Sequence, residues 1–546
     1  MTIQSIVSGP FGFAAFRPRL PKCASGLLLF LLLFSGISLL HGQTYSDLYE
    51  FGGKPDGCCP SYPSVMAQGQ DGSLYGITTA GGSNNLGLVF KITPSGAYST
   101  LYNFDTIHGS TPVGGLTLGP DGDLYGTTEE GGAHGYGNIF KITPSGILTV
   151  LYDFTGAADG GFPVSPLILS TDGTFHGTSY PGVAYKMTTK GVLTVIHTIP
   201  TTSYGPLLEA ADGNYYGVTE FGGTFSAGTV YKIAGTKVTT LYNFDGPHGS
   251  FPIGGLVQGS DGYLYGTTTA GGGTNAGVIF KISTAGALTD VVSFDSVHPS
   301  DGYQAYAGLI AGNDGNLYGV TIWGGQFGDG VIFKLTTAGA YSVLCSFQAV
   351  GTDGAYATPI QHTNGALFGM TKRGGALGNG GIYSLDDGIA PFASLVITQG
   401  TVGKKIGILG QGFSSASSVT FNGAPASFKV TSDTYMTATV PSGETGFVSV
   451  STSSGTLFSR QIFKVTPKVL SFSPTSGKSG DSVVITGTGL IQASAITVGG
   501  VRVTAYTVNS DKQLTVKVPT GAKTGKIAVT TPGGKSTSSA TFTVTP

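Results

Sequence analysis

Short apolar runs, each about the length of a β-strand, alternate with polar turn residues along most of the chain. In residues 113–154 four such runs, GGLTL, LYGTT, NIFKIT and LTVLYDF, are separated by Pro-Asp-Gly, a Gly-Gly loop and Pro-Ser-Gly. Runs of this length between turn residues indicate β-strands, and no helical period of 3.6 residues interrupts them. The pattern therefore predicts antiparallel sheets of four strands.

The same pattern recurs seven times. The second strand of each copy begins with LYG or a variant of it. The intervals between the successive glycines of these runs are 50, 51, 40, 49, 53 and 50 residues; the glycines are Gly76, Gly126, Gly177, Gly217, Gly266, Gly319 and Gly369. A period near 50 residues is typical of propeller blades and related arrays. We therefore predict an all-β fold in which residues 43–388 form a seven-bladed β-propeller.

The seventh copy lacks its fourth strand. It ends at GGIYSLDDG (residues 380–388), whereas YSDLYEF (residues 45–51) matches the fourth strand YSTLYNF (residues 98–104) of the first copy. An N-terminal strand placed against the last sheet would close the ring and pair an otherwise open edge. The sequence therefore predicts closure by residues 45–51.

An acidic residue followed by glycine joins the first and second strands of six copies. The pairs begin at Asp71, Asp121, Asp172, Asp212, Asp261 and Asp314, and the seventh copy has Asn364-Gly365. These dipeptides favour a two-residue hairpin, which needs positive φ at both positions. No acidic residues follow at calcium-loop spacing, so turn chemistry is the interpretation. One lysine in each third strand receives a structural role by the same reasoning; these are Lys91, Lys141, Lys186, Lys232, Lys281 and Lys334.

Two smaller units follow the repeats. Residues 389–466 and 467–546 have glycines and short strands that match at an offset of 77 residues, and both are rich in Ser, Thr, Val and Gly. We predict two immunoglobulin-like β-sandwiches.

The first 42 residues read as a signal peptide. Arg17, Arg19 and Lys22 precede the apolar run at residues 27–40, which is short for a membrane span. An uncleaved anchor is the alternative. The preferred interpretation is export, so that the protein is extracellular or at the cell surface and has no membrane span after cleavage.

The charge and cysteine content of the chain limit the partners and cofactors that we expect. The net charge is −2 and only 10% of residues are charged, so the composition does not indicate a basic surface that would bind nucleic acid. Cys58 and Cys59 are adjacent, so they either form a ring together or pair elsewhere, with Cys345 as one candidate. No spacing suggests a metal site, and we expect no cofactor and a monomer.

Candidate binding residues lie where the copies differ. The loops between second and third strands, and between the fourth strand and the next copy, should leave by one face, which we call the variable face; the other two turns define the turn face. The variable face carries His108, His248 and His298 at equivalent positions, and Trp323. These four residues are the predicted ligand contacts, because aromatic and polar groups together form most pockets. The alternative is that they only bond nearby backbone.

No catalytic set is visible. Glu129, Glu130 and Glu220 follow second strands in only two copies, and their spacing does not establish a carboxylate pair. Neither G-x-S-x-G nor H-E-x-x-H occurs. We therefore predict no catalytic residues.

Two family resemblances cover most of the chain. FSPTSGKSGDSVVITGTGL (from residue 472) and VPTGAKTGKIAVTTPGG (from residue 518) resemble the IPT/TIG family over residues 467–546, and residues 389–466 resemble it less. The repeat DGxLYGTTxxGG…FKITPSG…LYxFD resembles the GloVer-type tandem repeat of exported bacterial proteins over residues 45–388. That resemblance implies a surface or secreted setting and supplies no catalytic residue. NDGNLYGVT (residue 313) is also similar to the repeat of virginiamycin B lyase.

Two functions follow as expectations. In the first, the propeller presents its variable face to an extracellular glycan or protein, with the immunoglobulin-like units as spacers or contacts. In the second, it is an extracellular hydrolase or lyase acting on carbohydrate or peptide. The lack of a motif favours binding.

Overall fold

The computed structural model describes residues 43–546 apart from residues 61–62, 200 and 349–353. The expected signal peptide, residues 1–42, lies outside the described part. The rest is almost wholly β-structure, with two short 3-10 helices, η1 (Pro299–Asp301) and η2 (Phe413–Ser415). No helix in the described part of the chain is long and apolar enough to span a membrane.

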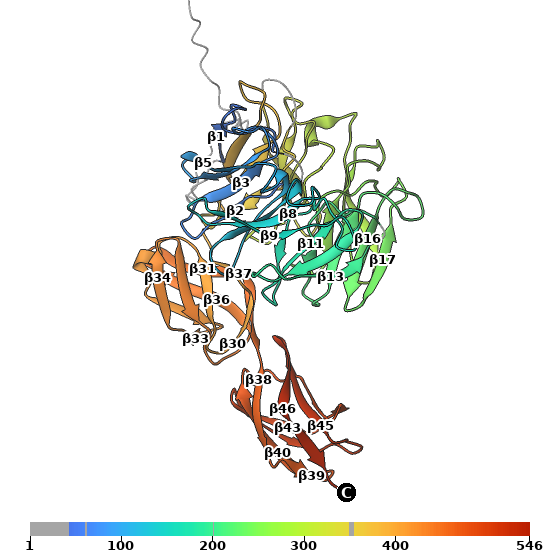
Figure 1. The fold of residues 1–546 in the computed structure, drawn as a ribbon, viewed down its shortest axis with the longest axis vertical. Coiled ribbons are helices and arrows are strands. Elements are labelled where there is room, and N and C mark those ends of the chain that lie inside the picture. Colours follow the sequence, from blue (N-terminus) through green and yellow to red (C-terminus); the bar gives the residue numbers. More distant parts are fainter. Residues whose placement is uncertain (1–42, 61–62, 200, 349–353) are drawn as a thin grey trace, which may run out of the picture.

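Residues 44–386 form seven four-stranded sheets (Figure 1). Sheet 1 consists of β2 (Ala67–Gln68), β3 (Leu74–Thr78), β4 (Leu88–Ile92) and β5 (Tyr98–Asn103). Sheet 2 consists of β6 (Ser110–Leu118), β7 (Leu124–Glu130), β8 (Asn138–Ile142) and β9 (Leu148–Asp153). Sheet 3 consists of β10 (Ile168–Leu169), β11 (Phe175–Ser179), β12 (Val183–Met187) and β13 (Leu193–Thr198). Sheets 4 and 5 consist of β14 (Leu208–Glu209), β15 (Tyr215–Thr219), β16 (Thr229–Ala234) and β17 (Lys237–Asn243); and β18 (Val257–Gln258), β19 (Leu264–Thr267), β20 (Val278–Ile282) and β21 (Leu288–Ser293). Sheets 6 and 7 consist of β22 (Ile310–Ala311), β23 (Leu317–Val320), β24 (Val331–Leu335) and β25 (Tyr341–Ser346); and β26 (Ile360–Gln361), β27 (Leu367–Thr371), β28 (Gly381–Asp386) and β1 (Thr44–Glu50).

Every sheet has the predicted antiparallel order, and each packs on the next through an apolar core. A further core joins sheet 7 to sheet 1, where Phe368 and Met370 share a cluster with Phe51, Leu74 and Phe90. The inner ends of these two sheets also meet, because Val65 and Thr358 form a parallel bridge. The seven sheets therefore contact one another in sequence, and the last contacts the first.

The N-terminal strand occupies the predicted place. β1 pairs antiparallel with β28, from Thr44 opposite Asp386 to Glu50 opposite Gly381. The register shifts after Asp47, so that Leu48 forms a bulge. In each of the other six sheets the pairing of the third strand with the fourth strand also contains a register shift. β1 thus has the geometry of the fourth strands of the repeat.

The bulge contacts the neighbouring sheet. A Cβ placed at Gly96, in the turn before β5, would lie 3.1 Å from the carbonyl oxygen of Leu48. Gly146 has the same relation to the carbonyl oxygen of Leu101, at 2.8 Å. The junction from sheet 7 to sheet 1 therefore repeats a contact found between sheets 1 and 2.

The turn between first and second strands differs from the predicted type. Gly72 N donates to Gly69 O at 3.1 Å, and Gly69 N donates to Ser73 O at 2.8 Å. Gly72 has φ 77°, whereas Asp71 is not among the residues with positive φ. The prediction of two residues with positive φ is wrong, because this is a three-residue loop, a type I turn followed by a glycine in the left-handed region.

The repeated aspartate holds its own sheet together, as predicted. Asp71 Oδ1 accepts the backbone N–H of Ser73, and Oδ2 accepts the Tyr75 hydroxyl at 3.0 Å. Lys91 Nζ lies 2.6 Å from the same carboxylate. Equivalent hydroxyl bonds occur at Tyr125, Tyr216, Tyr265 and Tyr318, and equivalent ion pairs at Lys141, Lys232 and Lys334. The signature DGxLYG is therefore explained by the fold.

The glycine that closes each LYG run leaves room for an aromatic ring of the third strand. A Cβ at Gly76 would lie 2.4 Å from Phe90 Cζ, whereas a Cβ at Gly273, in a loop, would meet nothing within 4 Å. We predict that Gly76→Ala lowers the free energy of unfolding by about 1–3 kcal/mol through overpacking. Urea denaturation measures this change, with Gly273→Ala as the control. Equal stability of the two variants would contradict the prediction.

Two sandwiches follow the repeats, as predicted. In the first, the sheet of β29 (Ser394–Leu395), β31 (Lys405–Leu409), β35 (Tyr435–Thr439) and β34 (Phe428–Ser432) faces that of β30 (Gln399–Thr401), β37 (Gly455–Thr466), β36 (Gly446–Thr452), β32 (Ser418–Phe421) and β33 (Ala424–Pro425). The second pairs β38 (Lys468–Ser473), β40 (Ser482–Thr488), β44 (Gln513–Lys517) and β43 (Tyr506–Ser510) with β39 (Ser476–Gly477), β46 (Gly534–Val544), β45 (Gly525–Thr531), β41 (Ala495–Val498) and β42 (Val501–Arg502).

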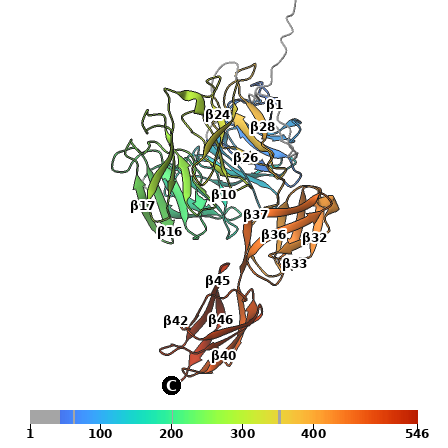
Figure 2. The ribbon, with the colours of Figure 1, turned by 180° about the vertical axis from the view of Figure 1, so that it is seen from behind.

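The first sandwich sits against the turn face of the repeat sheets, and the second extends away from them (Figures 1 and 2). The hydroxyls of Ser432 and Thr434 donate to Gln70 O at 3.2 and 2.9 Å. Gln411 Nε2 donates to Thr363 Oγ1 at 2.9 Å. The sandwich is thus fixed to the turns of sheets 1 and 7.

Cys58 and Cys59 are bonded to each other. Of the alternatives left open by the sequence, the adjacent ring is therefore the one observed, and the bridge from this pair to Cys345 is excluded. Cys58 also pairs its backbone with Ala80 of sheet 1, and Cys59 N donates to Asn379 O of sheet 7. The cysteine pair lies where these two sheets meet.

Candidate functional site

The three predicted histidines occupy equivalent positions, and each is bonded to an aspartate three residues earlier. Nδ1 of His108 lies 2.9 Å from Asp105, and the corresponding pairs with Asp245 and Asp295 are also 2.9 Å long. The hydrogen bond to Asp245 raises the pKa of His248. Each aspartate therefore fixes its loop and orients its imidazole.

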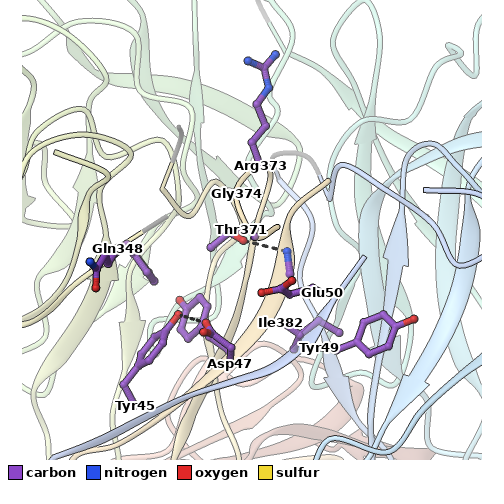
Figure 3. A pocket seen from close by; sticks show the side chains of 13 residues that line it. Tyr45, Asp47, Tyr49, Glu50, Gln348, Thr371, Arg373, Gly374 and Ile382 are labelled. Carbon is purple, nitrogen blue, oxygen red and sulfur yellow. Dashed lines mark hydrogen bonds between the residues drawn. The ribbon is translucent and has the colours of Figure 1, made fainter. Parts of the chain in front are cut away.

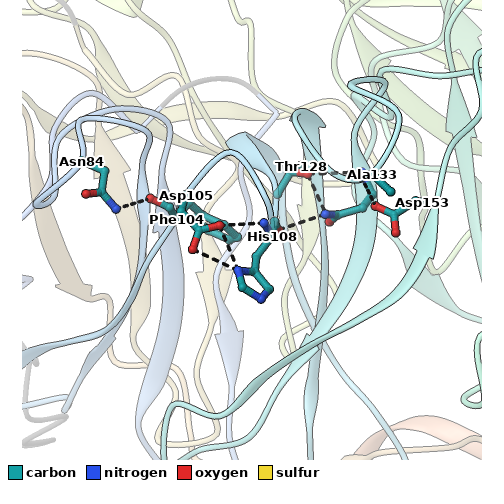
Figure 4. Close-up of polar contacts among 8 residues, drawn as sticks. Asn84, Phe104, Asp105, His108, Thr128, Ala133 and Asp153 are labelled. Carbon is teal, nitrogen blue, oxygen red and sulfur yellow. Dashed lines mark hydrogen bonds and ion pairs between the residues drawn. The ribbon is translucent and has the colours of Figure 1, made fainter.

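His108 lies beside an open depression formed by Thr106, Gly132, Ala133 and Asp153. Figure 4 shows its ring turned back toward Asp105. Its ring lies edge-on to Tyr102 of β5, the outermost strand of sheet 1. His248 and His298 belong to the loops that follow sheets 4 and 5 and do not line this depression. The depression beside His108 therefore does not bring the three histidines together.

Trp323 lies in the loop after β23. Its backbone pairs with Tyr303 in the preceding loop, and the residue is half-buried. It belongs to the variable face, as expected, but no described hydrogen bond or ring contact joins it to the three histidines.

A small hollow beside β1 is not a ligand site. Tyr45, Asp47, Gln348, Thr371 and Ile382 line it, and Figure 3 shows Tyr45 hydrogen-bonded to Asp47 there. Its volume is about 30 Å³. This is room for about one water molecule.

A different set of side chains meets on the variable face, at the centre of the seven sheets. It comprises half-buried residues from the connections of sheets 2 to 7, together with the exposed Tyr180; we call it the central cluster, and its members are Glu129, Tyr180, Tyr204, Glu220, Tyr306, Tyr356 and Lys372. All seven lie at the ends of second strands or in the loops that enter the first strands. Residues far apart in sequence therefore share one surface.

Electrostatic contacts show that the members are close to one another. The pKa of Tyr204 is raised by burial and then by the charges of Glu220 and Glu129. Burial also raises the pKa of Tyr306, and Glu220 contributes to that shift. Because Glu220 follows the second strand of sheet 4 while Tyr306 precedes the first strand of sheet 6, this contact joins residues of non-adjacent sheets.

Aromatic rings form the other side of the cluster. The rings of Tyr306 and Tyr356 lie 5.4 Å apart between centroids, and Lys372 Nζ lies 4.8 Å from the centroid of Tyr356. Tyr180, which is 53% exposed, contributes to the raised pKa of Tyr204. Aromatic residues that gather at one place on a surface make it a candidate interaction site.

The two carboxylates of the cluster have different surroundings. Burial raises the pKa of Glu129, and the neighbouring charge of Glu130 adds to that shift. Burial alone raises the pKa of Glu220. Both carboxylates also contribute to the raised pKa of Tyr204.

The raised pKa values of Glu129 and Glu220 predict that the free energy of unfolding depends on pH. Between the ordinary value of 4.5 and the raised pKa, the folded protein binds more protons than the unfolded chain. The free energy of unfolding therefore falls as the pH rises through this window. We expect Glu129→Gln and Glu220→Gln each to stabilise the protein by about 0.5–1 kcal/mol at pH 7 and by nothing below pH 4.

Thermal unfolding at the two pH values measures this difference. Glu444→Gln is the control, because Glu444 is exposed on the first sandwich, away from the central cluster. Destabilisation by either substitution at pH 7 would show that the carboxylate supports the fold instead of serving a ligand.

Few features of the sequence indicate this cluster. The two glutamates were noticed because they occur in single copies, but the tyrosines Tyr204, Tyr306 and Tyr356 stand in loops without a common spacing. A search for residue types that interrupt the repeat would have selected them. Among the described residues, no group of three or more His, Cys, Asp or Glu is arranged to hold a metal ion.

The described chain is thus an all-β repeat protein with C-terminal immunoglobulin-like sandwiches. It belongs to the family of the Gloeobacter/Verrucomicrobia repeat, whose profile matches residues 38–190 and 177–383. The IPT/TIG domain profile matches residues 391–463 and 467–544. Both resemblances inferred from the sequence are confirmed. No curated protein matches the chain.

Several solved structures are similar over part of their length. A fungal alcohol oxidase of the AA5 family, in complex with copper, is 15% identical with a TM-score of 0.44, over 75% of this chain and 98% of that chain. SGBP-B from a xyloglucan utilization locus in Bacteroides uniformis is 21% identical with a TM-score of 0.15, over 28% and 48%. The surface glycan-binding protein PbSGBP-B from Prevotella bryantii is 22% identical with a TM-score of 0.21, over 29% and 39%. These scores are too low to bear on function.

Proposed function

We propose that residues 43–388 form a closed seven-bladed β-propeller, and that residues 389–466 and 467–546 are two separate sandwich domains. The pairing of β1 with β28 and the apolar core between sheets 7 and 1 support closure. The residues 1–42 are proposed to direct export as a signal peptide, so that the mature protein is extracellular or at the cell surface and monomeric.

The propeller is proposed to bind a glycan through the central cluster without catalysing a reaction. The supporting observation is the meeting of aromatic and carboxylate side chains from several sheets at one point of the variable face. Aromatic rings offer apolar faces to a sugar ring, while carboxylates accept hydrogen bonds from its hydroxyls. Such a combination orients a polar ligand that also has apolar faces.

His108, His248, His298 and Trp323 are proposed as outer contacts of a longer ligand. Nδ1 of each histidine is held by its aspartate, which leaves Nε2 on the outward side of the ring for a ligand. A protein ligand would use the same surface, and an array of glycans distinguishes the two.

An extracellular hydrolase or lyase is the second candidate. The raised pKa values of Glu129 and Glu220 favour it, because catalytic acids often have such shifts. The lack of a catalytic motif in the sequence favours binding instead.

A glycan array probed with purified residues 43–546 tests the proposal. We expect binding to a restricted set of oligosaccharides, without release of products on prolonged incubation. The variant with His108, His248 and Trp323 all replaced by alanine should bind the same set about three- to tenfold more weakly. Binding to no glycan would refute the proposal, and cleaved products would establish the second candidate.

A further inference from the structure

A second cavity lies at the other end of the seven sheets, between their turn face and the first sandwich. Its volume is about 780 Å³, within the range of small-molecule sites. The first strands β14, β18, β22 and β26 provide one wall, and residues 460–464 of β37 provide the other. The docked sandwich therefore supplies one wall of this cavity.

The sandwich wall is basic and apolar. Phe463 and Val465 of β37 are buried in the sandwich core, so the alternating residues Arg460, Ile462 and Lys464 face the cavity. Ile462 is 41% exposed although it is a large apolar residue. In this strand Arg460 and Lys464 therefore flank the apolar side chain of Ile462.

Arg460 is fixed in place but keeps its charge unpaired. Its Nη1 donates to Ala311 O of β22 at 3.0 Å. Desolvation by nearby protein lowers the pKa of Arg460, while the side chain stays exposed on the side of the cavity that it lines. Within the described residues, neither Arg460 nor Lys464 has a carboxylate in ion-pair range. A guanidinium without an ion-pair partner is free to bind a carboxylate through two parallel hydrogen bonds.

The propeller wall supplies apolar surface and few charges. Leu208, Val257, Ile310 and Ile360 are half-buried and line the cavity. Glu209 is the acidic residue of the lining. Its carboxylate accepts hydrogen bonds from Thr171 N, from the Thr171 hydroxyl and from the Ser170 hydroxyl. The charge offered to a ligand here is therefore positive, whereas the central cluster on the variable face contains two carboxylates.

We propose that this interdomain cavity is a second ligand site, selective for sugar chains that carry carboxylates, such as uronate oligosaccharides. Arg460 and Lys464 bind the carboxylate, and Ile462 with the apolar residues of the first strands contacts the faces of the sugar rings. The first sandwich is then part of a binding site and not a spacer. The choice of a sugar over another carboxylate rests on the proposed glycan-binding function.

Calorimetric titration of residues 43–546 with oligogalacturonate, oligomannuronate and their methyl esters tests the site. We expect at least one acidic chain to bind at least tenfold more tightly than its ester, because esterification removes the charge that Arg460 and Lys464 recognise. Arg460→Gln and Lys464→Gln should each abolish that preference. Lys405→Gln, an exposed cation elsewhere on the same sandwich, should leave it intact.

The outcomes separate this site from the central cluster. Equal affinity for acids and esters, or a preference unchanged by Arg460→Gln, would overturn the cavity site alone, provided that neutral oligosaccharides still bind the array. A tetraglutamate peptide that binds as tightly as the acidic sugars would refute the sugar assignment. Absence of binding by any oligosaccharide would overturn both proposals. Melting temperatures within 2 °C of the parent protein, a tolerance of roughly 0.5–1 kcal/mol, would confirm that each variant is folded.

Discussion

Deletion of residues 43–51 is expected to destabilise the whole repeat region. The deletion removes the strand paired with β28 and takes Phe51, whose exposure is 0%, out of the core between sheets 7 and 1. Replacement of one buried Phe by Ala costs about 3–5 kcal/mol, and the deletion adds the loss of the strand pairing. We expect a much lower melting temperature and exposed apolar surface, measured by calorimetry and dye binding.

Single substitutions locate the effect within the strand. Phe51→Ala should destabilise by about 3–5 kcal/mol, since its ring packs against those of Phe90 and Tyr98. Ser46→Ala, at an exposed position of the same strand, should be neutral. A synthetic peptide of residues 43–52 added to the truncated protein should restore part of the lost stability. If truncation leaves the melting temperature unchanged, the strand does not close the ring.

Replacement of Tyr306 and Tyr356 together by alanine is expected to weaken glycan binding by roughly 30-fold or more, equivalent to about 2 kcal/mol. The two rings pack on each other, and Lys372 lies over Tyr356, so the pair presents one aromatic surface in the central cluster. Titration calorimetry with the best oligosaccharide from the array measures the change.

Tyr263→Ala provides the matched control. Tyr263 is also partly exposed and has a lysine, Lys281, over its ring, but it stands in a turn of the opposite face. Affinity should therefore be unaffected by this substitution. Equal losses in the control and in the double variant would place the ligand elsewhere than in the central cluster.

Much of the fold follows from local chemistry that repeats. Asp71, Gly72, Tyr75 and Gly76 each have a role inside one sheet, so their spacing alone predicts the hairpin and its packing. The turn type was mistaken because Asp-Gly suits more than one hairpin loop, and the count of loop residues depends on where the pairing of the strands ends. The closing strand was predictable because residues 45–51 match residues 98–104.

The candidate sites were much less accessible to sequence reasoning. Glu129 and Glu220 both act on Tyr204, and Glu220 also acts on Tyr306, only because residues from different sheets meet on one face, and no interval along the chain encodes this. The histidines attracted attention through their regular spacing, yet regularity in a repeat protein usually marks a structural role, as their aspartate partners show. The role of Arg460 could not be predicted from the sequence, because its surroundings depend on how the first sandwich packs against the repeat sheets.

The pairing of β1 with β28 also sets the order in which the molecule is completed. Gln43 and Asp387 share a hydrogen bond although they are 344 positions apart. Contacts of such long range form late and slowly during folding. β1 must therefore wait for nearly all the remaining repeats, and it gains its partner strand only after the chain has been made through residue 387.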